Sequence, residues 1–490
     1  MLLAALAAIA IVTQDQTPLR AAPRDSAQQQ ELLWQGDVLE IRGQKLNYLQ
    51  VYDHRNERAG YIRATQVRTS SLQAQAAPEL LAVVRFLRDT AGAETLGIAY
   101  SAAYIKAAPA EAIEPEIFDA LGSMAERLAR QASSRQAKAS DIALAAHLDV
   151  AASYGVTMQS FERDGRIQRC YDGDAFRHVL AMTNPTAFIK TLADEKAADQ
   201  RARAALALTR HECIDPGIGP TAKYALDNWR AQILDNIDLS NLPDYLKNRV
   251  HIRRAGVWAS LAYERARRNE NAAEAANRSL QEYAAVNKLE LPDEDNYAYN
   301  DAGVRVGASR FANEQLFSEN PVSEKMLSLK TKMAMTTVAG QPGETCLLLT
   351  DAKHDQSAPL LKRCTYGVVW ISSARFNAQG TVATLAVQPL ESWRELWVLQ
   401  RKNNQWEVDV LPPSTSGPDI GYLEFAGWVP GTEKILAARE TKIDGRFQRS
   451  FEVIALDSLQ TQKQASKPEF LSLFYRWQDP QWKRQTVSVR

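Results

Sequence analysis

The chain has 490 residues, and this length suggests about three domains. Hydrophobic residues make up 45% of it and charged residues 24%, which is the composition of a folded globular protein and excludes a disordered one. The 58 basic and 58 acidic residues cancel, so overall charge gives no attraction to nucleic acid or to an anionic membrane.

The first residues, MLLAALAAIAIV, form an apolar run that is too short to span a membrane. Ala8 and Ala10 offer an A-x-A cleavage pattern, and we therefore predict a signal-peptide-like segment over residues 1–12. The basic residues that normally precede such a segment are missing, since the first Lys or Arg is Arg20. The alternative interpretation of the run is a buried β-strand or the end of a helix.

The next segment mixes apolar and charged side chains in the manner of short strands. In DVLEIRG, Val38 and Ile41 stand among charged neighbours, and YLQVYD continues the pattern. Gly36, Gly43 and Gly60 supply turns between these stretches. The sequence therefore predicts a small β domain over residues 13–70.

Four motifs in this segment resemble, in order, those of the bacterial SH3-type (SH3b) domains. LRAAP is similar to their VRSGP-like opening, WQGDVLEI to the strand after their KGxxVxV turn, NYLQV to xWYKV, and AGYIRATQV to the closing TGWVxxxYV. The resemblance covers residues 13–68 and implies a small β-barrel. Ala22 replaces the usual glycine of the opening turn, and Tyr48 and Tyr61 stand in the places of the two tryptophans.

The resemblance also implies a groove, rimmed by aromatic and polar residues, that binds a cell-wall peptide or a protein segment. The corresponding candidates in this chain are Trp34, Tyr48, Tyr52, His54 and Tyr61. For Tyr48 and Tyr61 the alternative is a purely structural role in the core.

From residue 77 to residue 319 the apolar residues recur with helical spacing. Pro78 and Pro115 each stand at the natural first position of a helix with one apolar face. The run of short helices predicts an all-α domain with a solenoid-like arrangement. WASLAY at 258–263 is similar to the first helix of a tetratricopeptide-type repeat, although the regular period of a true array is missing.

The chain then turns to β structure, over residues 326–490. Phe376, Trp428 and Trp477 are 52 and 49 residues apart, and each precedes a turn and an apolar strand. This recurrence is similar to the blades of TolB-like β-propellers, which normally need at least about four blades. Residues 343–373 are a candidate for a degenerate further blade. The alternatives are a sandwich or an open meander.

The four cysteines fall into two pairs that are close in sequence, Cys170 with Cys213 and Cys346 with Cys364. An even count in an exported chain is best interpreted as two disulfides, whereas the alternative is four buried thiols in a cytosolic protein. No C-x-x-C spacing is present, which excludes a zinc ribbon. We therefore predict a periplasmic or secreted protein.

No motif for catalysis, cofactor or metal stands out. The tripeptide GAS at 307–309 lacks the second glycine of a serine nucleophile turn, and Cys213 beside His211 is assigned to a disulfide. The six histidines have no metal-binding spacing, and no glycine-rich loop leads into Lys-Ser or Lys-Thr. The sequence predicts no cofactor and no metal site.

We therefore predict a multidomain α+β protein with an SH3-like barrel, a helical domain and an antiparallel β domain. It acts as a non-catalytic binding or scaffold protein of the bacterial envelope. Its expected partner is a peptide, a protein or peptidoglycan, with no nucleic acid and no membrane span after signal removal. The alternative is a cell-wall-associated hydrolase whose carboxylates meet only in space. The oligomeric state is left open.

Overall fold

The computed structural model describes residues 8–133, 140–163, 165–183, 194–314, 325–326, 333–415 and 419–485. The chain divides into two compact units. The first comprises Met1–Gly219 and Ile237–Leu242, and the second comprises Pro220–Asn236 and Pro243–Arg490. Residues 1–7 of the predicted signal segment lie outside the described residues.

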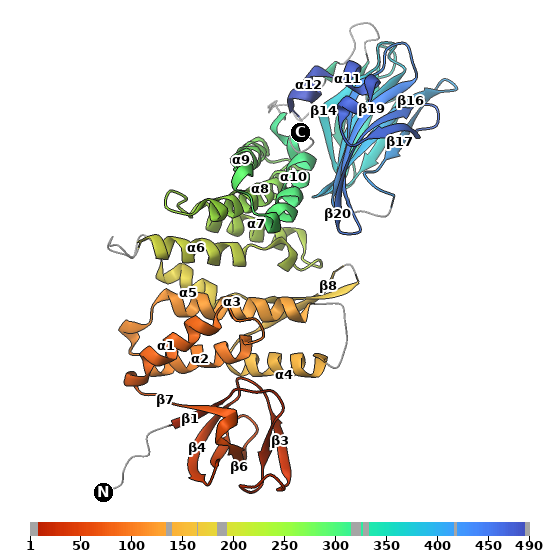
Figure 1. The fold of residues 1–490 in the computed structure, drawn as a ribbon. Coiled ribbons are helices and arrows are strands. Elements are labelled where there is room, and N and C mark those ends of the chain that lie inside the picture. Colours follow the sequence, from red (N-terminus) through yellow and green to blue (C-terminus); the bar gives the residue numbers. More distant parts are fainter. Residues whose placement is uncertain are drawn as a thin grey trace. The chain divides into compact units, whose positions relative to one another are not determined.

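The first unit begins with seven strands (Figure 1). They are β1 (Ala8–Val12), β2 (Thr17–Arg20), β3 (Gln29–Leu33), β4 (Val38–Lys45), β5 (Tyr48–Asp53), β6 (Arg58–Arg63) and β7 (Val67–Ser71). The strands form one antiparallel sheet in the order β3-β2-β6-β5-β4-β1-β7. The predicted N-terminal β region is therefore present, and it starts earlier than expected, at Ala8.

Strand β1 lies in the apolar run at the start of the chain, where a buried strand was the alternative interpretation. Its side chains point alternately to two cores: Ala10 and Val12 to the interior of the sheet, and Ile9 and Ile11 to the helices that follow. A strand that is buried on both faces has no polar positions, and its sequence is therefore a continuous apolar run. Residues 8–12 are thus a buried β-strand, the alternative to a signal segment.

Six helices and one hairpin complete the described part of the first unit. The helices are α1 (Ala77–Leu87), α2 (Glu94–Ala107), α3 (Pro115–Ala132), α4 (Ser140–Ser153), α5 (Asp174–Met182) and α6 (Asp194–Leu208). Pro78 and Pro115 lie in the first turns of α1 and α3, as predicted. The hairpin of β8 (Met158–Arg163) and β9 (Arg166–Tyr171) corrects the all-α prediction for this region.

The strands and helices of the first unit share a core. The backbone at Gly36 has a φ of +95°, and a Cβ there would lie 2.7 Å from the carbonyl oxygen of Thr95 in α2. The hydroxyl of Tyr154 donates a hydrogen bond to the carbonyl of Gly36 at 2.5 Å. Near it, His147 of α4 contacts Asp15, with 2.7 Å between Nε2 and Oδ1. The N-terminal strands therefore pack against the helices of the same unit.

A carboxylate on α3 links three helices of the first unit and makes its stability depend on pH. Glu116 accepts from Arg85 of α1 and Lys196 of α6, both at 2.8 Å. The Arg85 hydrogen bonds, helped by Lys196, lower the pKa of Glu116 from 4.5 to about 2. Because the folded-state pKa is the lower one, the contact stabilises the fold above about pH 4.5, and this contribution is lost as the pH falls toward about 2.

We expect Glu116→Gln to lower the free energy of unfolding by about 1–2 kcal/mol at neutral pH, since partial exposure of the cations screens the interaction. The difference between variant and wild type should shrink as the pH falls through 4 toward 3. Urea unfolding of the full chain at several pH values measures this difference in the free energy of unfolding. The control is Glu111→Gln, which changes an exposed carboxylate. A constant difference at all pH values would contradict the assignment.

The helices of the second unit that precede its strands are α7 (Pro220–Asp235), α8 (Asp244–Arg267), α9 (Ala273–Ala284) and α10 (Asn296–Ser309). Two glycines of α10 permit close packing. A Cβ on Gly303 would lie 2.5 Å from the hydroxyl of Tyr283, and one on Gly307 would lie 2.5 Å from the ring of Tyr422. The second contact joins the helices directly to the β structure of the same unit. No helix among the described residues has the length and apolar character that crossing a membrane requires.

In the described part of the second unit, the strands form three successive four-stranded meanders. The first has β10 (Lys325–Met326), β11 (Ala334–Ala339), β12 (Thr345–Thr350) and β13 (Leu361–Thr365). The second has β14 (Val368–Phe376), β15 (Val382–Leu390), β16 (Trp393–Lys402) and β17 (Gln405–Leu411). The third has β18 (Gly421–Trp428), β19 (Lys434–Ile443), β20 (Arg446–Ala455) and β21 (Thr461–Ala465). The tight turns use Asn403-Asn404 and Asp444-Gly445, all with positive φ, as two-residue hairpins require.

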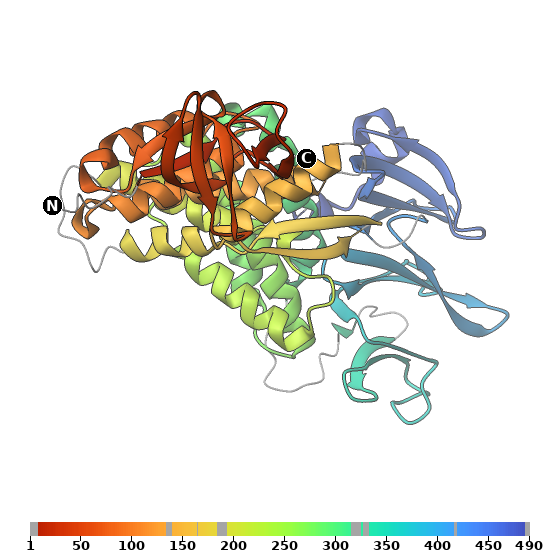
Figure 2. The same ribbon diagram turned by 90° about the horizontal axis from the view of Figure 1, so that it is seen from below.

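Figure 2 shows the three meanders side by side in chain order. One apolar core lies between the first and the second, and another between the second and the third. A short parallel pairing of β16 with β18 joins the last two into one sheet. The described part of this unit contains three meanders, whereas a closed propeller normally needs at least about four.

The predicted third repeat, at Trp477, is wrong. Its residues form α11 (Ser472–Trp477) and α12 (Pro480–Gln485) instead of strands. Phe474 and Trp482 pack with α10 on the face of the third meander. Gly427 allows this approach, because a Cβ there would lie 2.4 Å from the carbonyl oxygen of Trp477.

Candidate functional site

The pleat of β5 divides its side chains between the core and an open face. Leu49 and Val51 point into the core of the sheet, whereas Tyr48, Gln50 and Tyr52 share the opposite face, because successive side chains of a strand alternate. Gln50 is exposed and Tyr52 is partly exposed. Strand β5 therefore places Tyr48, which is buried, and Tyr52, which is partly exposed, on the same face and about 13 Å apart, at about 3.3 Å per residue.

The register of the neighbouring strands adds to this surface. Tyr61 of β6 pairs with Gln50, and Arg63 pairs with Tyr48. On the other side Glu40 of β4 pairs with Tyr52. Paired residues lie on the same face of a sheet, so tyrosines of β5 and β6 and charged residues of β4 and β6 come together. We call the surface formed by Glu40, Arg42, Tyr48, Gln50, Tyr52, His54, Tyr61 and Arg63 the tyrosine face.

One end of the tyrosine face is built around Tyr52. The guanidinium of Arg42 lies 3.9 Å from the centre of its ring, and the ring of His54 meets it edge-on at 4.8 Å. Glu40 holds both groups, with 2.8 Å between its Oε2 and Nε2 of His54 and 3.2 Å to Nη2 of Arg42. The hydrogen bond from Arg42, with that from His54, lowers the pKa of Glu40. The ring of Tyr52 thus lies between the guanidinium of Arg42 and the imidazole of His54, which are both exposed.

The other end is built around Tyr48. Its hydroxyl donates a hydrogen bond to Asp25, which also forms an ion pair with Arg63. The Arg63 hydrogen bond, followed by that of Tyr48, lowers the pKa of Asp25, and the same contact with Asp25 raises the pKa of Tyr48. The ring of Tyr48 is buried, as the structural alternative expected, while Arg63 is 45% exposed.

Trp34 is the one sequence candidate that lies elsewhere. It follows β3, and its ring stands edge-on to His147 of α4 with 6.3 Å between the ring centres. Its side chain therefore contributes to the contact between strands and helices of the first unit. The other four candidates lie on the tyrosine face. Arg42 and Arg63 were not predicted as site residues, although Arg63 alternates with Tyr61 along β6 and Arg42 alternates with Glu40 along β4.

The second unit contains a lysine, serine and aspartate in contact, a combination found in some hydrolases. Nζ of Lys223 lies 2.9 Å from the hydroxyl of Ser260, which donates to Asp227 at 2.5 Å. Burial alone would lower the pKa of Lys223, but the carboxylates of Glu391 and Asp227 raise it above its usual value. A lysine held protonated cannot accept the serine proton, and Ser260 is buried. The cluster is a structural ion-pair network.

A glycoside hydrolase needs two carboxyl groups that face the substrate, one of them with a raised pKa. Burial raises the pKa of Asp119 and of Glu264, but neither lines the cavity found between the meanders. That cavity, of about 20 Å³, is lined by Glu424 and Asp479. Burial opposes the charge of Glu424, yet Arg310 and Arg394 lower its pKa, so it stays ionised and does not serve as an acid.

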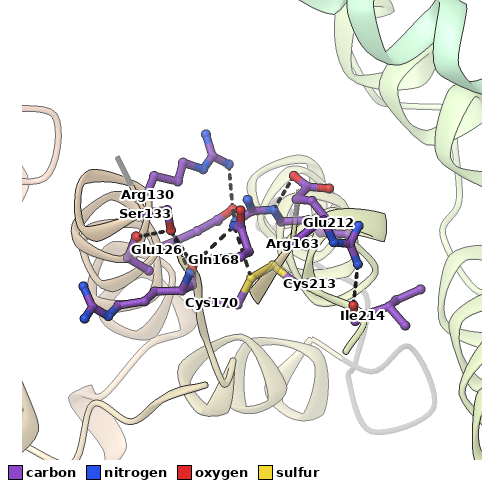
Figure 3. The surroundings of a disulfide bond; sticks show 12 residues. Glu126, Arg130, Ser133, Arg163, Gln168, Cys170, Glu212, Cys213 and Ile214 are labelled. Carbon is purple, nitrogen blue, oxygen red and sulfur yellow. Dashed lines mark hydrogen bonds and ion pairs between the residues drawn. A yellow bond between two sulfur atoms is a disulfide. The ribbon is translucent and has the colours of Figure 1, made fainter. Parts of the chain in front are cut away.

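The cysteines are in the predicted pairs. Cys170 and Cys213 form a disulfide that fastens β9 to the turn before α7, where Arg163 also donates to the carbonyl of Ile214 at 2.6 Å (Figure 3). Cys170 lies in strand β9, inside the region that was predicted to be all-α. Closing a loop of this size stabilises a fold by roughly 4 kcal/mol in the chain-entropy model.

Cys346 and Cys364 are direct partners across β12 and β13 and form the second disulfide. Among the described residues they make, with Glu344, one group close enough to hold a metal ion. Sulfur atoms that are bonded to each other are not available as thiolate ligands. The group therefore offers no metal site.

Comparison of the chain with protein-family models, curated proteins and solved structures finds no match.

Proposed function

We propose that the chain is an exported envelope protein that binds an extended peptide without catalysing a reaction, and that the tyrosine face is its binding surface. The observation that carries the proposal is the gathering of Tyr52, Tyr61 and His54 with exposed charged groups on one open face of the β sheet. Partly exposed aromatic rings with nearby hydrogen-bonding groups are typical of interaction surfaces.

The size and charge of the face favour an extended peptide. The distance of about 13 Å from Tyr48 to Tyr52 matches roughly four residues of an extended chain. Each end carries one carboxylate and one guanidinium, Glu40 with Arg42 and Asp25 with Arg63. A peptide that has both amine and carboxylate groups, such as a cell-wall stem peptide or a protein segment, finds complementary charges at either end.

The proposed location is the periplasm or the exterior of the cell. Two disulfides favour an oxidising compartment. We also propose a fold type for each of the three regions of the chain. The N-terminal strands would be an SH3b-like barrel, the helices a solenoid-like scaffold, and the three meanders an open, propeller-like platform.

Retention of the full chain by purified peptidoglycan tests the proposal. We expect wild type to be retained and Tyr52→Ala to be retained about tenfold less, since losing a stacked ring costs about 1–1.5 kcal/mol of binding. The matched control is Tyr245→Ala, which removes an exposed tyrosine of α8. Circular dichroism of each variant verifies folding. Equal retention of Tyr52→Ala and wild type would exclude the tyrosine face, and no retention of wild type would exclude cell-wall binding.

A further inference from the structure

The disulfide between Cys346 and Cys364 lies at an edge of the first meander. Strand β13 pairs with β12, and in the described part of the second unit it pairs with no other strand. Cys346 in β12 is buried, whereas Cys364 in β13 is partly exposed. Of the two cysteines, Cys364 is therefore the one that a thiol in solution can approach.

The strand ladder places the two cysteines directly opposite each other. Their Cα atoms are 3.9 Å apart, whereas the Cα atoms of a disulfide usually lie about 4.4–6.8 Å apart. The Cα atoms of Cys170 and Cys213 are 5.7 Å apart, which is within that range. A disulfide outside the usual range is more easily reduced. The spacing therefore favours reduction of the cross-strand disulfide over the other one.

The length of the closed loop favours the same order of reduction. Cys346 and Cys364 are 18 residues apart in sequence, and Cys170 and Cys213 are 43 residues apart. In the chain-entropy model a disulfide that closes a shorter loop stabilises the fold less. Because reduction removes this stabilisation, it costs less free energy at Cys346–Cys364.

Apart from its backbone ladder with β12, strand β13 makes few buried contacts. The side chains of Lys362 and Arg363 are exposed, and Leu361 is only partly buried. The guanidinium of Arg363 lies 5.8 Å from the centre of the Trp397 ring. Trp397 is buried and belongs to the core between the first and the second meander. An edge strand with so little buried surface opens locally once its covalent link is cut, and it then uncovers part of this core.

We propose that Cys346–Cys364 is a redox-sensitive switch: a small dithiol reduces it while Cys170–Cys213 stays oxidised, and β13 then separates from β12. A thiolate of the dithiol attacks the sulfur of Cys364, and Cys346 leaves as a thiolate and is protonated. The second thiolate of the dithiol attacks its own partner sulfur in the mixed disulfide, and Cys364 leaves in the same way. The dithiol loses two electrons and two protons and becomes a cyclic disulfide, and the two cysteines gain them. The switch is independent of the tyrosine face.

Graded reduction of the wild-type full chain tests the order in which the disulfides open. The protein is equilibrated in mixtures of reduced and oxidised dithiothreitol, free thiols are trapped with N-ethylmaleimide, and labelled peptides are identified by mass spectrometry. We expect Cys346 and Cys364 to be labelled at a ratio of reduced to oxidised dithiol that is about tenfold lower than the ratio for Cys170 and Cys213. Opening of Cys170–Cys213 first, or of both disulfides at the same ratio, would overturn the proposal.

Hydrogen exchange at a dithiol ratio that opens only Cys346–Cys364 tests the structural consequence. We expect faster exchange in β12 and β13, and unchanged exchange in β18 to β20 of the third meander. The double variant Cys346→Ser/Cys364→Ser removes the bond without a reductant and should show the same change, with circular dichroism to verify its fold. If β13 of the reduced wild type exchanged as slowly as that of the oxidised protein, the disulfide would not control this strand and the proposal would fail.

Discussion

Deleting residues 1–12 is expected to unfold the N-terminal β region. The deletion removes β1, which pairs with β4 on one side and with β7 on the other. Ile11 and Val12 are completely buried, and Ile9 is nearly so. Burying three such side chains contributes about 5–8 kcal/mol, which is comparable to the whole stability of a typical domain. Hydrogen exchange of the full chain, followed by mass spectrometry, should show loss of protection over β4 to β7.

A pair of point variants separates this effect from a general effect of truncation. Ile11 and Arg68 are direct partners on β1 and β7, but Ile11 is buried and Arg68 is exposed. Ile11→Asp should therefore reproduce the loss of protection, and Arg68→Asp should not. If the chain that lacks residues 1–12 exchanged as slowly as wild type, residues 8–12 would be dispensable for the fold, as a signal segment is.

Replacing Glu424 by Gln is expected to cost about 3–5 kcal/mol of stability in the second unit, because it leaves Arg310 and Arg394 buried without their shared carboxylate. The amide also turns donor groups toward the guanidiniums. The loss should appear as faster hydrogen exchange in β18, α10 and α12. The control is Glu407→Gln on β17, whose carboxylate is 55% exposed and lies 3.8 Å from Lys402.

For Glu407→Gln we expect the free energy of unfolding to change by less than about 0.5 kcal/mol. If Glu424→Gln and Glu407→Gln had equally small effects, the buried cluster would not hold the helices to the sheet. The two variants can be compared directly, because both carboxylates lie on strands of the same sheet.

Local sequence patterns predicted those elements that depend only on residues close together in the chain. The proline at the start of α1 and of α3, and the alternation in β5, follow directly from backbone and pleat geometry. The apolar run at β1 was ambiguous, because hydrophobicity does not say what covers a segment. Both a signal segment and a strand between two cores need continuous apolar residues.

Other features depend on contacts between distant parts of the chain. The aromatic spacing at Trp477 suggested a third repeat, but Phe474 and Trp482 also suit short helices that cap a sheet. The hairpin β8–β9 was missed within a helical region, where a disulfide to Cys213 holds it. The place of Trp34 depends on how α4 docks, which no local pattern encodes. Four of the five candidate aromatic residues nevertheless lie together on one face of the sheet, and their role in binding remains a prediction.

Hydrogen exchange of the full chain with and without a soluble stem peptide tests the central claim most directly, because it maps the bound surface residue by residue. The account predicts added protection in β4, β5 and β6, over residues 38–63, and none in the second unit. Protection confined to other elements, or the same protection pattern in the Tyr52→Ala variant, would contradict the tyrosine face as the binding surface.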